Sequence, residues 1–464
     1  MSLRPLLDRD DERRQLEEAW RRAAAGTPQL ALLWGRRRVG KTFLLSHFVQ
    51  DKPAVFFGAT EQAEAIELER LAEATRRDLG DGVADLLGGR FASWEAALRF
   101  FAALAAERPV CLVIDEAPYL ARSTPGFASI VQVVWDRLPP GTRLLLVLAG
   151  SAVATMEAMI GAGGPLRGRP SLTLRLDPLD IWAARAFLPR LRAEHVVEAY
   201  AACGGYPLHL QAWDQSVGTE ANLLRLAGQA GGILLDDARM ILREELSESG
   251  GYARVLAAIG RGRTRPSQIA SEVGQRIERP LDILCAIGMV RRQLPVGAPK
   301  GARPSYEIAD PYLAFWFRVL YSEAERIEGG QGRSVLRMRR PEWERHVGWV
   351  FEEVARAHAI RLTAGGDLPE DLLIGRWWRL GPDPCEIDVL GLRGGQTALI
   401  GEARWQRRPI TRRDLRELLA KANCAPAPRD DPIVAFWSRR GAEPEVTAAG
   451  AKSFDVETML AEPT

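Results

Sequence analysis

The sequence predicts an α/β protein that begins with a parallel sheet, and three observations lead to this fold class. Apolar runs of the length of buried strands alternate with stretches of helical periodicity through the first 178 residues. A glycine-rich loop joins the first of these strands to the following helix. The chain has 464 residues, 47% of them hydrophobic and 26% charged, a composition typical of folded domains and a length that fits about three of them.

The first part of the chain is expected to form a sheet domain, residues 1–178, followed by a helical lid, residues 179–249. The lid is predicted because the helical period runs from Ile181 to about Leu246. The strands of the sheet are expected at residues 29–34, 54–60, 110–115, 143–151 and 171–176.

Two further domains are predicted after the lid. Three short helical stretches and a polar hairpin at 250–327 are typical of a winged helix, and EGGQGR at 328–333 is predicted to be a linker. The last domain, 328–464, is expected to contain a helix, three strands and a second helix.

The loop after the first strand, GRRRVGKT, has the spacing G-x-x-x-x-G-K-T of a phosphate-binding loop. Gly35 and Gly40 let the backbone N–H groups surround a phosphate, Lys41 reaches the β- and γ-oxygens, and Thr42 holds Mg²⁺ at the start of the helix. The other residues expected to contact the nucleotide are Arg36, Arg37, Arg38, Val39 and Phe43. The sequence therefore predicts a P-loop domain that binds ATP and Mg²⁺.

Lysine is scarce in this chain, which gives Lys41 additional weight. Of the 62 basic residues five are lysines, and the remaining 57 are arginines. Lysine is kept where a compact ammonium group must fit beside phosphate, a place where arginine is not an equivalent replacement. This favours a catalytic role for Lys41.

Two acidic residues end the predicted strand 110–115 and its continuation, at the sheet edge where ligands of open α/β sheets bind. Asp115 is expected to hold Mg²⁺ through water, and Glu116 to polarise the water that attacks ATP. Ser151, at the end of the next strand, is predicted either to sense the γ-phosphate or attacking water, or to cap a helix. Catalysis of hydrolysis is therefore assigned to Lys41 and Glu116.

These motifs together resemble the archaeal-type ATPases, relatives of the AAA+ and STAND NTPases. The matching segments are LLDRDDERRQL, GRRRVGKT, LVIDEAPYL, LAGSAVATME, GPLRGR and CGGYPLHL. The resemblance implies that Arg9 contacts the base, although Asp8-Arg9-Asp10 departs from the Gly-Arg-Glu pattern of that family. It also implies that Arg169, or Arg167 in its place, stabilises charge on the γ-phosphate, within one chain or from a neighbour in a homo-oligomer.

A basic segment stands out in the predicted winged helix. Residues 252–308 contain ten basic and four acidic residues, a net charge of +6, whereas the whole chain carries +2. This charge favours binding to double-stranded or branched DNA through phosphate contacts, while packing against another protein is the alternative. The residues expected to contact DNA are Gln275, Arg276 and Arg279 near the start of the second helix and Arg291, Arg292, Lys300 and Arg303 in the wing.

Acidic residues of the last domain predict a second metal site. Asp388 and Glu402 lie on consecutive predicted strands and Glu352 on the preceding helix, which would let three carboxylates meet around Mg²⁺ or Mn²⁺. The alternative is that these carboxylates pair with arginines such as Arg376 or Arg379.

This last domain resembles the domain of unknown function that follows the ATPase in the same family, which is itself similar to PD-(D/E)xK restriction-endonuclease-like nucleases. The resemblance implies a small α/β nuclease-like fold, but Arg404 stands where the nuclease pattern has lysine. Arginine there either follows the general replacement of lysine in this chain, with cleavage kept, or indicates a site that no longer cleaves. Because Lys41 is retained, the second interpretation is favoured.

Other features exclude several classes of protein. The five cysteines form no CxxC pair, which argues against a zinc site or a disulfide framework. No uncharged run reaches the roughly 18 residues of a membrane span, and the first residues lack the apolar core of a signal peptide, so a soluble cytoplasmic protein is expected.

The predicted function is therefore a Mg²⁺-dependent ATPase that couples its nucleotide state to DNA or partner binding. The alternatives are a non-hydrolysing, ATP-gated regulator and an ATP-regulated, metal-dependent DNA nuclease.

Overall fold

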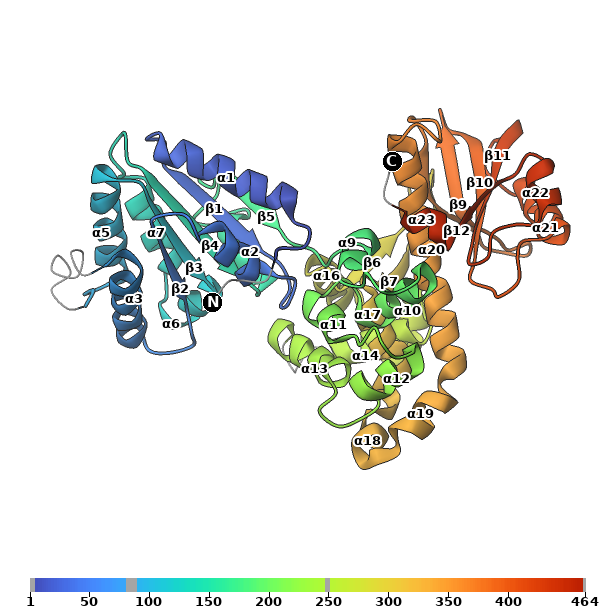
Figure 1. Cartoon of the computed structure of the whole chain (residues 1–464), viewed down its shortest axis with the longest axis horizontal. Helices are drawn as coiled ribbons and strands as arrows, with labels where there is room; N and C mark the ends of the chain where they lie inside the picture. Colours follow the sequence, from blue (N-terminus) through green and yellow to red (C-terminus); the bar gives the residue numbers. More distant parts are fainter. Residues whose placement is uncertain (1–4, 81–89, 247–250, 462–464) are drawn as a thin grey trace. The chain divides into compact units, whose positions relative to one another are not determined.

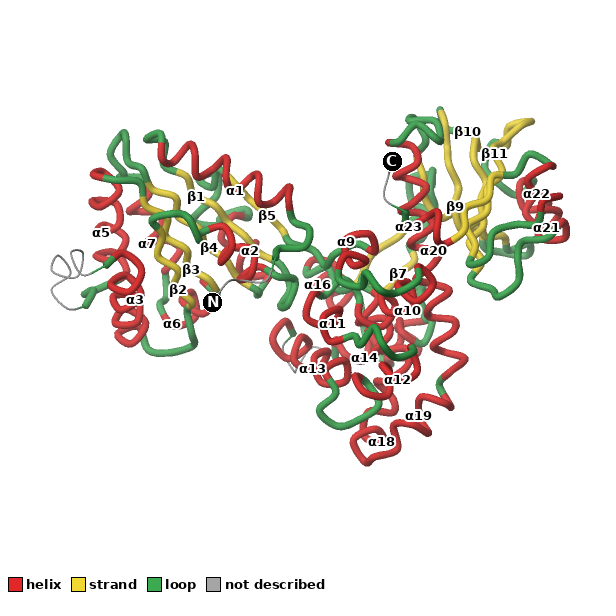
Figure 2. Tube along the Cα trace, viewed as in Figure 1, coloured by secondary structure: helices red, strands yellow, loops and turns green. Residues whose placement is uncertain are grey.

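A computed structural model describes residues 5–80, 90–246 and 251–461. The chain divides into two compact units, an N-terminal unit (Met1–Pro178) and a C-terminal unit (Leu179–Thr464) (Figure 1). Figure 2 shows that each unit contains a sheet of its own.

The sheet of the N-terminal unit has five parallel strands in the order β2-β3-β4-β1-β5. Strands β1, β3 and β4 are buried along their whole length, which explains why they are continuous apolar runs in the sequence. The arrangement confirms the predicted α/β fold with a parallel sheet. The strands are β1 (Gln29–Trp34), β2 (Ala54–Gly58), β3 (Val110–Asp115), β4 (Leu144–Gly150) and β5 (Leu172–Arg175).

Helices cover this sheet and complete its core. The helix α1 contacts β1, β4 and β5, whereas α5 contacts β3 and β4. Between the strands and α3, α5, α7 and α8 lies an apolar core that includes the fully buried rings of Trp94, Phe101 and Phe127. The helices are α1 (Asp10–Ala24), α2 (Lys41–Phe48), α3 (Glu64–Leu79), α5 (Trp94–Glu107), α6 (Ala117–Ser123), α7 (Phe127–Trp135) and α8 (Val153–Ile160).

The C-terminal unit begins with the helices that the sequence predicts. They are α9 (Ile181–Ala186), α10 (Ala193–Cys203), α11 (Pro207–Ala212), α12 (Thr219–Leu226) and α13 (Ile233–Glu245). Three helices and an antiparallel hairpin follow, α14 (Tyr252–Gly260), α15 (Pro266–Val273), α16 (Glu278–Ala286), β6 (Val290–Gln293) and β7 (Ser305–Ile308). The predicted domain boundary between residues 249 and 250 falls outside the described residues.

The prediction of a linker at residues 328–333 is wrong, because these residues are helical. They continue from α17 (Pro311–Phe315) through irregular helical turns into α19 (Gly332–Met338), with a kink where Gly330 has φ 83°. A Cβ atom on Gly332 would overlap the carbonyl oxygen of Gly228, so this glycine permits close packing.

A mixed five-stranded sheet, ordered β12-β11-β10-β9-β8, ends the chain. Strands β8, β9 and β10 are antiparallel neighbours, and β11 and β12 continue the sheet in the direction of β10. Two of these strands, β11 and β12, are absent from the sequence prediction. The elements are α20 (Arg340–Ala364), β8 (Leu373–Arg379), β9 (Cys385–Arg393), β10 (Gln396–Arg404), α21 (Arg412–Ala422), β11 (Pro428–Ser438), α22 (Pro444–Ala448), β12 (Lys452–Asp455) and α23 (Val456–Leu460).

Two buried histidines of α20 make the stability of the C-terminal unit depend on pH. His346 donates from Nε2 to the carbonyl of Ala201 (2.8 Å) and accepts from Arg318 (3.3 Å), and burial together with the Arg318 charge lowers its pKa to about 3. His358 accepts the indole N–H of Trp437 (3.0 Å), and burial lowers its pKa to about 4. Both histidines are therefore neutral in the folded protein.

Because an unfolded histidine binds a proton below about pH 6.5, the free energy of unfolding should fall as the pH decreases from 6.5 to 4. The slope reaches at most about 1.4 kcal/mol per pH unit for each histidine. Urea unfolding followed by tryptophan fluorescence at several pH values measures it, and His346→Gln should reduce it. The half-exposed His195, replaced by glutamine, is the control and should leave the slope unchanged. An identical slope for His346→Gln and the wild type would contradict this assignment.

Candidate functional site

The predicted phosphate loop lies between the end of β1 and the start of α2. Its backbone adopts left-handed conformations at Arg38 (φ 69°) and at Gly40 (φ 98°), of which the second precedes the first residue of the helix. A Cβ atom on Gly35 would overlap the carbonyl oxygen of Leu176, so only glycine fits there. The motif thus requires its two glycines for different reasons. The first permits close packing, and the second permits a left-handed backbone conformation.

Lys41 points back into this loop. Its residue is 4% exposed, and its ammonium group donates to the carbonyls of Gly35 (2.8 Å) and Arg36 (3.1 Å). Arg9, for which the resemblance implies a base contact, donates to the carbonyls of Val39 (3.4 Å) and Asp177 (2.5 Å). Arg9 therefore braces the loop against the segment that follows β5.

The remaining residues of the predicted nucleotide site lie in the loop or in the first turn of α2. Arg36 is buried, whereas Arg37 and Arg38 are half-buried. Phe43 is half-buried on α2, and its ring meets that of His47 edge to face at 4.6 Å between centroids.

Thr42 lies on α2, which follows β1, and Asp115 ends β3. The two residues come together although β4 lies between β1 and β3 in the sheet. The hydroxyl of Thr42 donates to Oδ2 of Asp115 (2.6 Å), and the other carboxylate oxygen accepts the N–H of Glu116 (3.0 Å). Burial raises the pKa of Asp115, and the hydrogen bond from Thr42 partly offsets this. A hydroxyl and a carboxylate oxygen are hard ligands of the kind that Mg²⁺ takes, so this pair fits the predicted metal.

Glu116 is held beside this pair by Ser151. Its Oε2 accepts both the backbone N–H (3.0 Å) and the hydroxyl (2.8 Å) of Ser151, at the end of β4. Glu116 itself has φ 55° and ψ 39°, a left-handed conformation that is uncommon for a residue other than glycine and is concentrated at functional sites. The carboxyl ends of β1, β3 and β4 thus bring Lys41, Thr42 and Glu116 to one edge of the sheet.

Arg169 lies apart from this group of residues, and its role in stabilising γ-phosphate charge, within one chain or from a neighbour, stays a prediction. Its guanidinium forms two bonds to Asp136 (2.7 and 2.8 Å), and it precedes Ser171, whose N–H donates to Leu30 near the start of β1. The phosphate loop follows the other end of β1, about 17 Å away at 3.3 Å per strand residue. Arg167, the second choice, is exposed in the same turn.

The C-terminal carboxylates lie near one another but are bound to protein donors. Oδ2 of Asp388, on β9, accepts the N–H of Ala403 (3.0 Å). Oε1 of Glu402, on β10, accepts from Lys421 (2.7 Å) and pairs with Arg404 (2.7 Å). Glu402 is therefore paired with two cations that belong to the chain itself.

Glu352 lies on α20, where burial and the charge of Asp388 raise its pKa to about 8. Among the described residues, no three His, Cys, Asp or Glu side chains form a group that could hold a metal ion. The predicted site of Glu352, Asp388 and Glu402 is thus not assembled as a metal centre.

The alternative expectation is that Asp388 and Glu402 pair with Arg376 or Arg379. Arg376 binds Glu307 and Glu386 and not these two carboxylates. Lys421 is the partner that sequence reasoning missed. Its signal was available, since it is one of only five lysines and lies on the helix after β10.

None of the helices within the described ranges is both long enough and apolar enough to cross a membrane.

The five-stranded parallel sheet, with a glycine-rich phosphate loop after β1 and an acidic pair after β3, is the fold of a P-loop NTPase. Residues 6–212 match the family described as an ATPase domain predominantly from Archaea. Residues 316–418 match the family described as "Archaea bacterial proteins of unknown function". The N-terminal part of the chain therefore resembles an ATPase domain in sequence and has the fold of a P-loop NTPase, and a segment similar to a family of unknown function follows it.

The chain is also similar to a relative in sequence and to solved structures. An uncharacterized protein of Methanocaldococcus jannaschii is 26% identical over 412 residues, which cover 86% of this chain and 87% of that protein. The Walker-type ATPase of Pyrococcus abyssi is 21% identical with a TM-score of 0.50, and the match covers 68% of this chain and 99% of that one. The ORC2 protein of Aeropyrum pernix, solved with ADPNP and ADP, is 14% identical with a TM-score of 0.43, over 71% of this chain and 96% of that one.

Proposed function

We propose that the protein is a Mg²⁺-dependent ATPase that couples its nucleotide state to the binding of DNA or of a partner. One observation carries the proposal: Glu116 is held by Ser151 beside the Thr42–Asp115 pair (2.6 Å) and the loop that contains Lys41. A site that only binds nucleotide needs the loop and the metal ligands. A carboxylate fixed next to them supplies the further group that hydrolysis requires.

Each side chain has a distinct task in this mechanism. Lys41 neutralises negative charge on the β- and γ-phosphates, and the backbone N–H groups of the loop orient them. Thr42 and Asp115 would hold Mg²⁺, which would supply positive charge to offset the negative charge that develops on the phosphates. Glu116 orients the attacking water and accepts its proton, while Ser151 keeps the carboxylate in place. Arg169, which faces away from this site, would serve a neighbouring copy of the chain.

Removing the metal should stop the reaction. We expect purified protein to release phosphate from ATP in the presence of Mg²⁺, to lose this activity when EDTA is added in excess, and to regain it when Mg²⁺ is restored. A phosphate-release assay measures all three states. Turnover that EDTA leaves unchanged would contradict the assignment of Thr42 and Asp115, and nucleotide binding without any turnover would favour the non-hydrolysing regulator.

The second part of the proposal is that α14–α16 and the β6–β7 hairpin act as a winged helix that binds duplex DNA. Arg276, just before α16, and Arg279, in its first turn, are exposed and have no ion pair with a carboxylate in the part of the chain that the structure describes. By contrast, Arg261 and Arg263 both pair with Glu272 (2.7 and 2.8 Å). Arg291, on β6, is also paired, because it binds Glu353 (2.7 Å). The charge available for phosphate is therefore concentrated near the start of α16 and at Arg292, Lys300 and Arg303 of the hairpin.

Duplex affinity should fall steeply as salt rises, because phosphate contacts release counterions. Replacing Arg276 and Arg279 by alanine should weaken binding and lower the slope of log K against log salt by about 2. Fluorescence anisotropy with a labelled duplex measures the slope, and the paired Arg261→Ala is the matched control. Binding that does not depend on salt would refute this interface.

We propose further that the C-terminal sheet domain does not cleave DNA and serves in binding DNA or a partner. The reason is that Lys421 and Arg404 already neutralise the charge of Glu402. Plasmid incubated with the protein and Mn²⁺ should remain intact. Cleavage that disappears in Asp388→Ala and Glu402→Ala would instead support the nuclease.

A further inference from the structure

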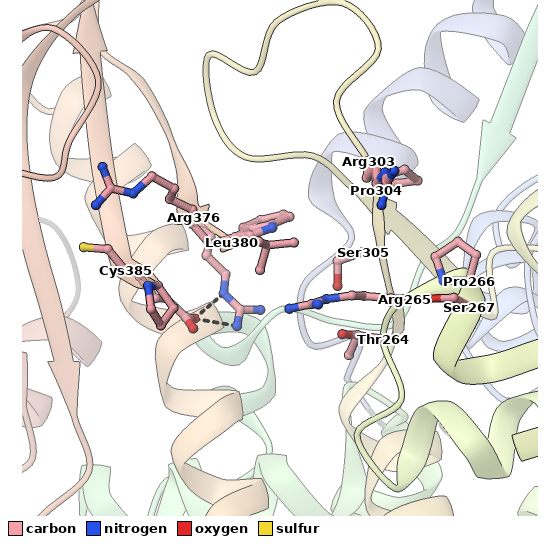
Figure 3. Close-up of a pocket in the computed structure, with 14 residues that line it drawn as sticks. Thr264, Arg265, Pro266, Ser267, Arg303, Pro304, Ser305, Arg376, Leu380 and Cys385 are labelled. Carbon is pink, nitrogen blue, oxygen red and sulfur yellow. Dashed lines mark hydrogen bonds and ion pairs between the residues drawn. The ribbon is translucent and has the colours of Figure 1, made fainter. Parts of the chain in front are cut away.

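A cavity of about 660 Å³ lies within the C-terminal unit, and it shares Arg303 with the predicted DNA contacts of the wing but none with those near the start of α16. Three segments that are distant in sequence line it (Figure 3). They are the start of α15, the loop residues that lead into β7, and the end of β8 with the turn into β9. Its lining residues are Thr264, Arg265, Pro266, Ser267, Arg303, Pro304, Ser305, Arg376, Trp378, Arg379, Leu380, Pro384, Cys385 and Glu386. The cavity thus joins the proposed winged helix to the last sheet.

The lining carries four arginines and one acidic residue. The acidic residue, Glu386, is already bound by Arg376 (2.6 Å), which also pairs with Glu307. Arg265, Arg303 and Arg379 have no ion pair with a carboxylate among the residues that the structure describes. The cavity therefore has an excess of positive charge that the protein does not neutralise.

Figure 3 shows Arg265 extended into the cavity, toward the wall that carries Arg376. The charge of Arg376 is already offset by Glu307 and Glu386, whereas Arg265 brings a charge into the cavity that no carboxylate among the described residues offsets. The neighbouring arginines of the same domain, Arg261 and Arg263, are both paired with Glu272. Arginines in this region are therefore not unpaired as a rule. The arrangement fits an anionic ligand.

The ligand must also suit the other groups of the lining. Trp378 is half-buried at the cavity, and the hydroxyl-bearing residues Thr264, Ser267 and Ser305 lie along the opposite wall. A positive groove combined with an aromatic side chain is the arrangement that binds single-stranded nucleic acid, in which phosphates meet the cations and a base stacks on the ring. A volume of about 660 Å³ suits ligands of nucleotide size, not the width of a duplex.

We propose that this cavity binds a short phosphodiester segment of a single-stranded nucleic acid. The inference deepens the proposed coupling to DNA by assigning a second site, specific for unpaired strands, to the boundary between the winged helix and the last sheet. It rests on the proposed nucleic-acid function and not on ATP hydrolysis, so the two can fail separately.

The test is the anisotropy of a fluorescein-labelled 12-nucleotide oligothymidylate titrated with the full-length protein at low salt. The double variant Arg265→Ala/Arg303→Ala should bind at least tenfold more weakly. Trp378→Ala should lose at least fivefold, in the range measured for one stacked base, and Trp378→Phe should recover most of that loss. The paired residues provide the matched control, because Arg261→Ala/Arg263→Ala removes the same charge without facing the cavity.

Two further measurements separate this site from the others. Arg276→Ala/Arg279→Ala should weaken duplex binding and leave the affinity for oligothymidylate unchanged. ATP turnover without DNA should be the same in the cavity variants as in the wild type, which also shows that they fold.

Three results would overturn the proposal. The first is equal affinity for oligothymidylate in the cavity variants and the wild type. The second is full displacement of the strand by millimolar inorganic phosphate, which would indicate a site for free phosphate. The third is displacement by polyglutamate at the same charge concentration, which would indicate an acidic peptide as the ligand.

Discussion

Replacing Lys41 by alanine is expected to lower ATP turnover at least about 100-fold and to weaken nucleotide binding. The ammonium group is enclosed by the loop, where it donates to the carbonyls of Gly35 and Arg36, and no other lysine lies in this part of the sequence before Lys52. Charge stabilisation by a positioned donor in a protected site is worth two to three orders of magnitude in rate. Phosphate release and calorimetric titration with a non-hydrolysable ATP analogue measure the two effects.

The control for this variant is Lys452→Ala, which removes one of the other four lysines from an exposed position in the C-terminal unit. It should leave turnover and binding at wild-type values. Unchanged turnover in Lys41→Ala would remove the phosphate loop from the mechanism.

Replacing Glu116 by glutamine is expected to separate binding from hydrolysis. Glutamine keeps the shape and accepts the hydrogen bonds from Ser151, but it cannot take a proton from water, so turnover should fall by about 10² to 10⁴. ATP binding should remain, because Lys41, Thr42 and Asp115 are untouched. Glu107→Gln is the matched control, since Glu107 is exposed just before β3 while Glu116 directly follows it.

Ser151→Ala should have a smaller effect than Glu116→Gln. The backbone N–H of residue 151 still donates to Glu116 after the hydroxyl is removed, so the carboxylate loses one of two bonds. A loss of turnover as large as that of Glu116→Gln would indicate that Ser151 acts on the nucleotide or the water directly.

The sheet of the N-terminal unit could be predicted because its strands β1, β3 and β4 are buried along their whole length and therefore read as continuous apolar runs. The same argument explains the failure at β11, which begins with PRDD, and at β12, which has four residues and no apolar run. EGGQGR was misassigned because Gly332 is required for packing against Gly228, and composition does not distinguish that role from flexibility.

The candidate site could be predicted where the spacing of residues along the chain determines how they are placed in space, as it does from Gly35 to Thr42. The pairing of Thr42 with Asp115 followed from their positions at strand ends. The pairing of Lys421 with Glu402 depends on how α21 packs on β10, which no local pattern contains. The arginine-lined cavity was beyond sequence reasoning for the same reason, because its residues span positions 264 to 386.

Phosphate release by the wild type and by Glu116→Gln, measured on preparations whose ATP binding has been titrated, tests the central claim most directly. The expected result is Mg²⁺-dependent release by the wild type and release at least about 100-fold slower in the variant, with equal ATP affinity. Equal rates of release in the two proteins would contradict the assignment of Glu116 and, with it, the proposed mechanism of hydrolysis.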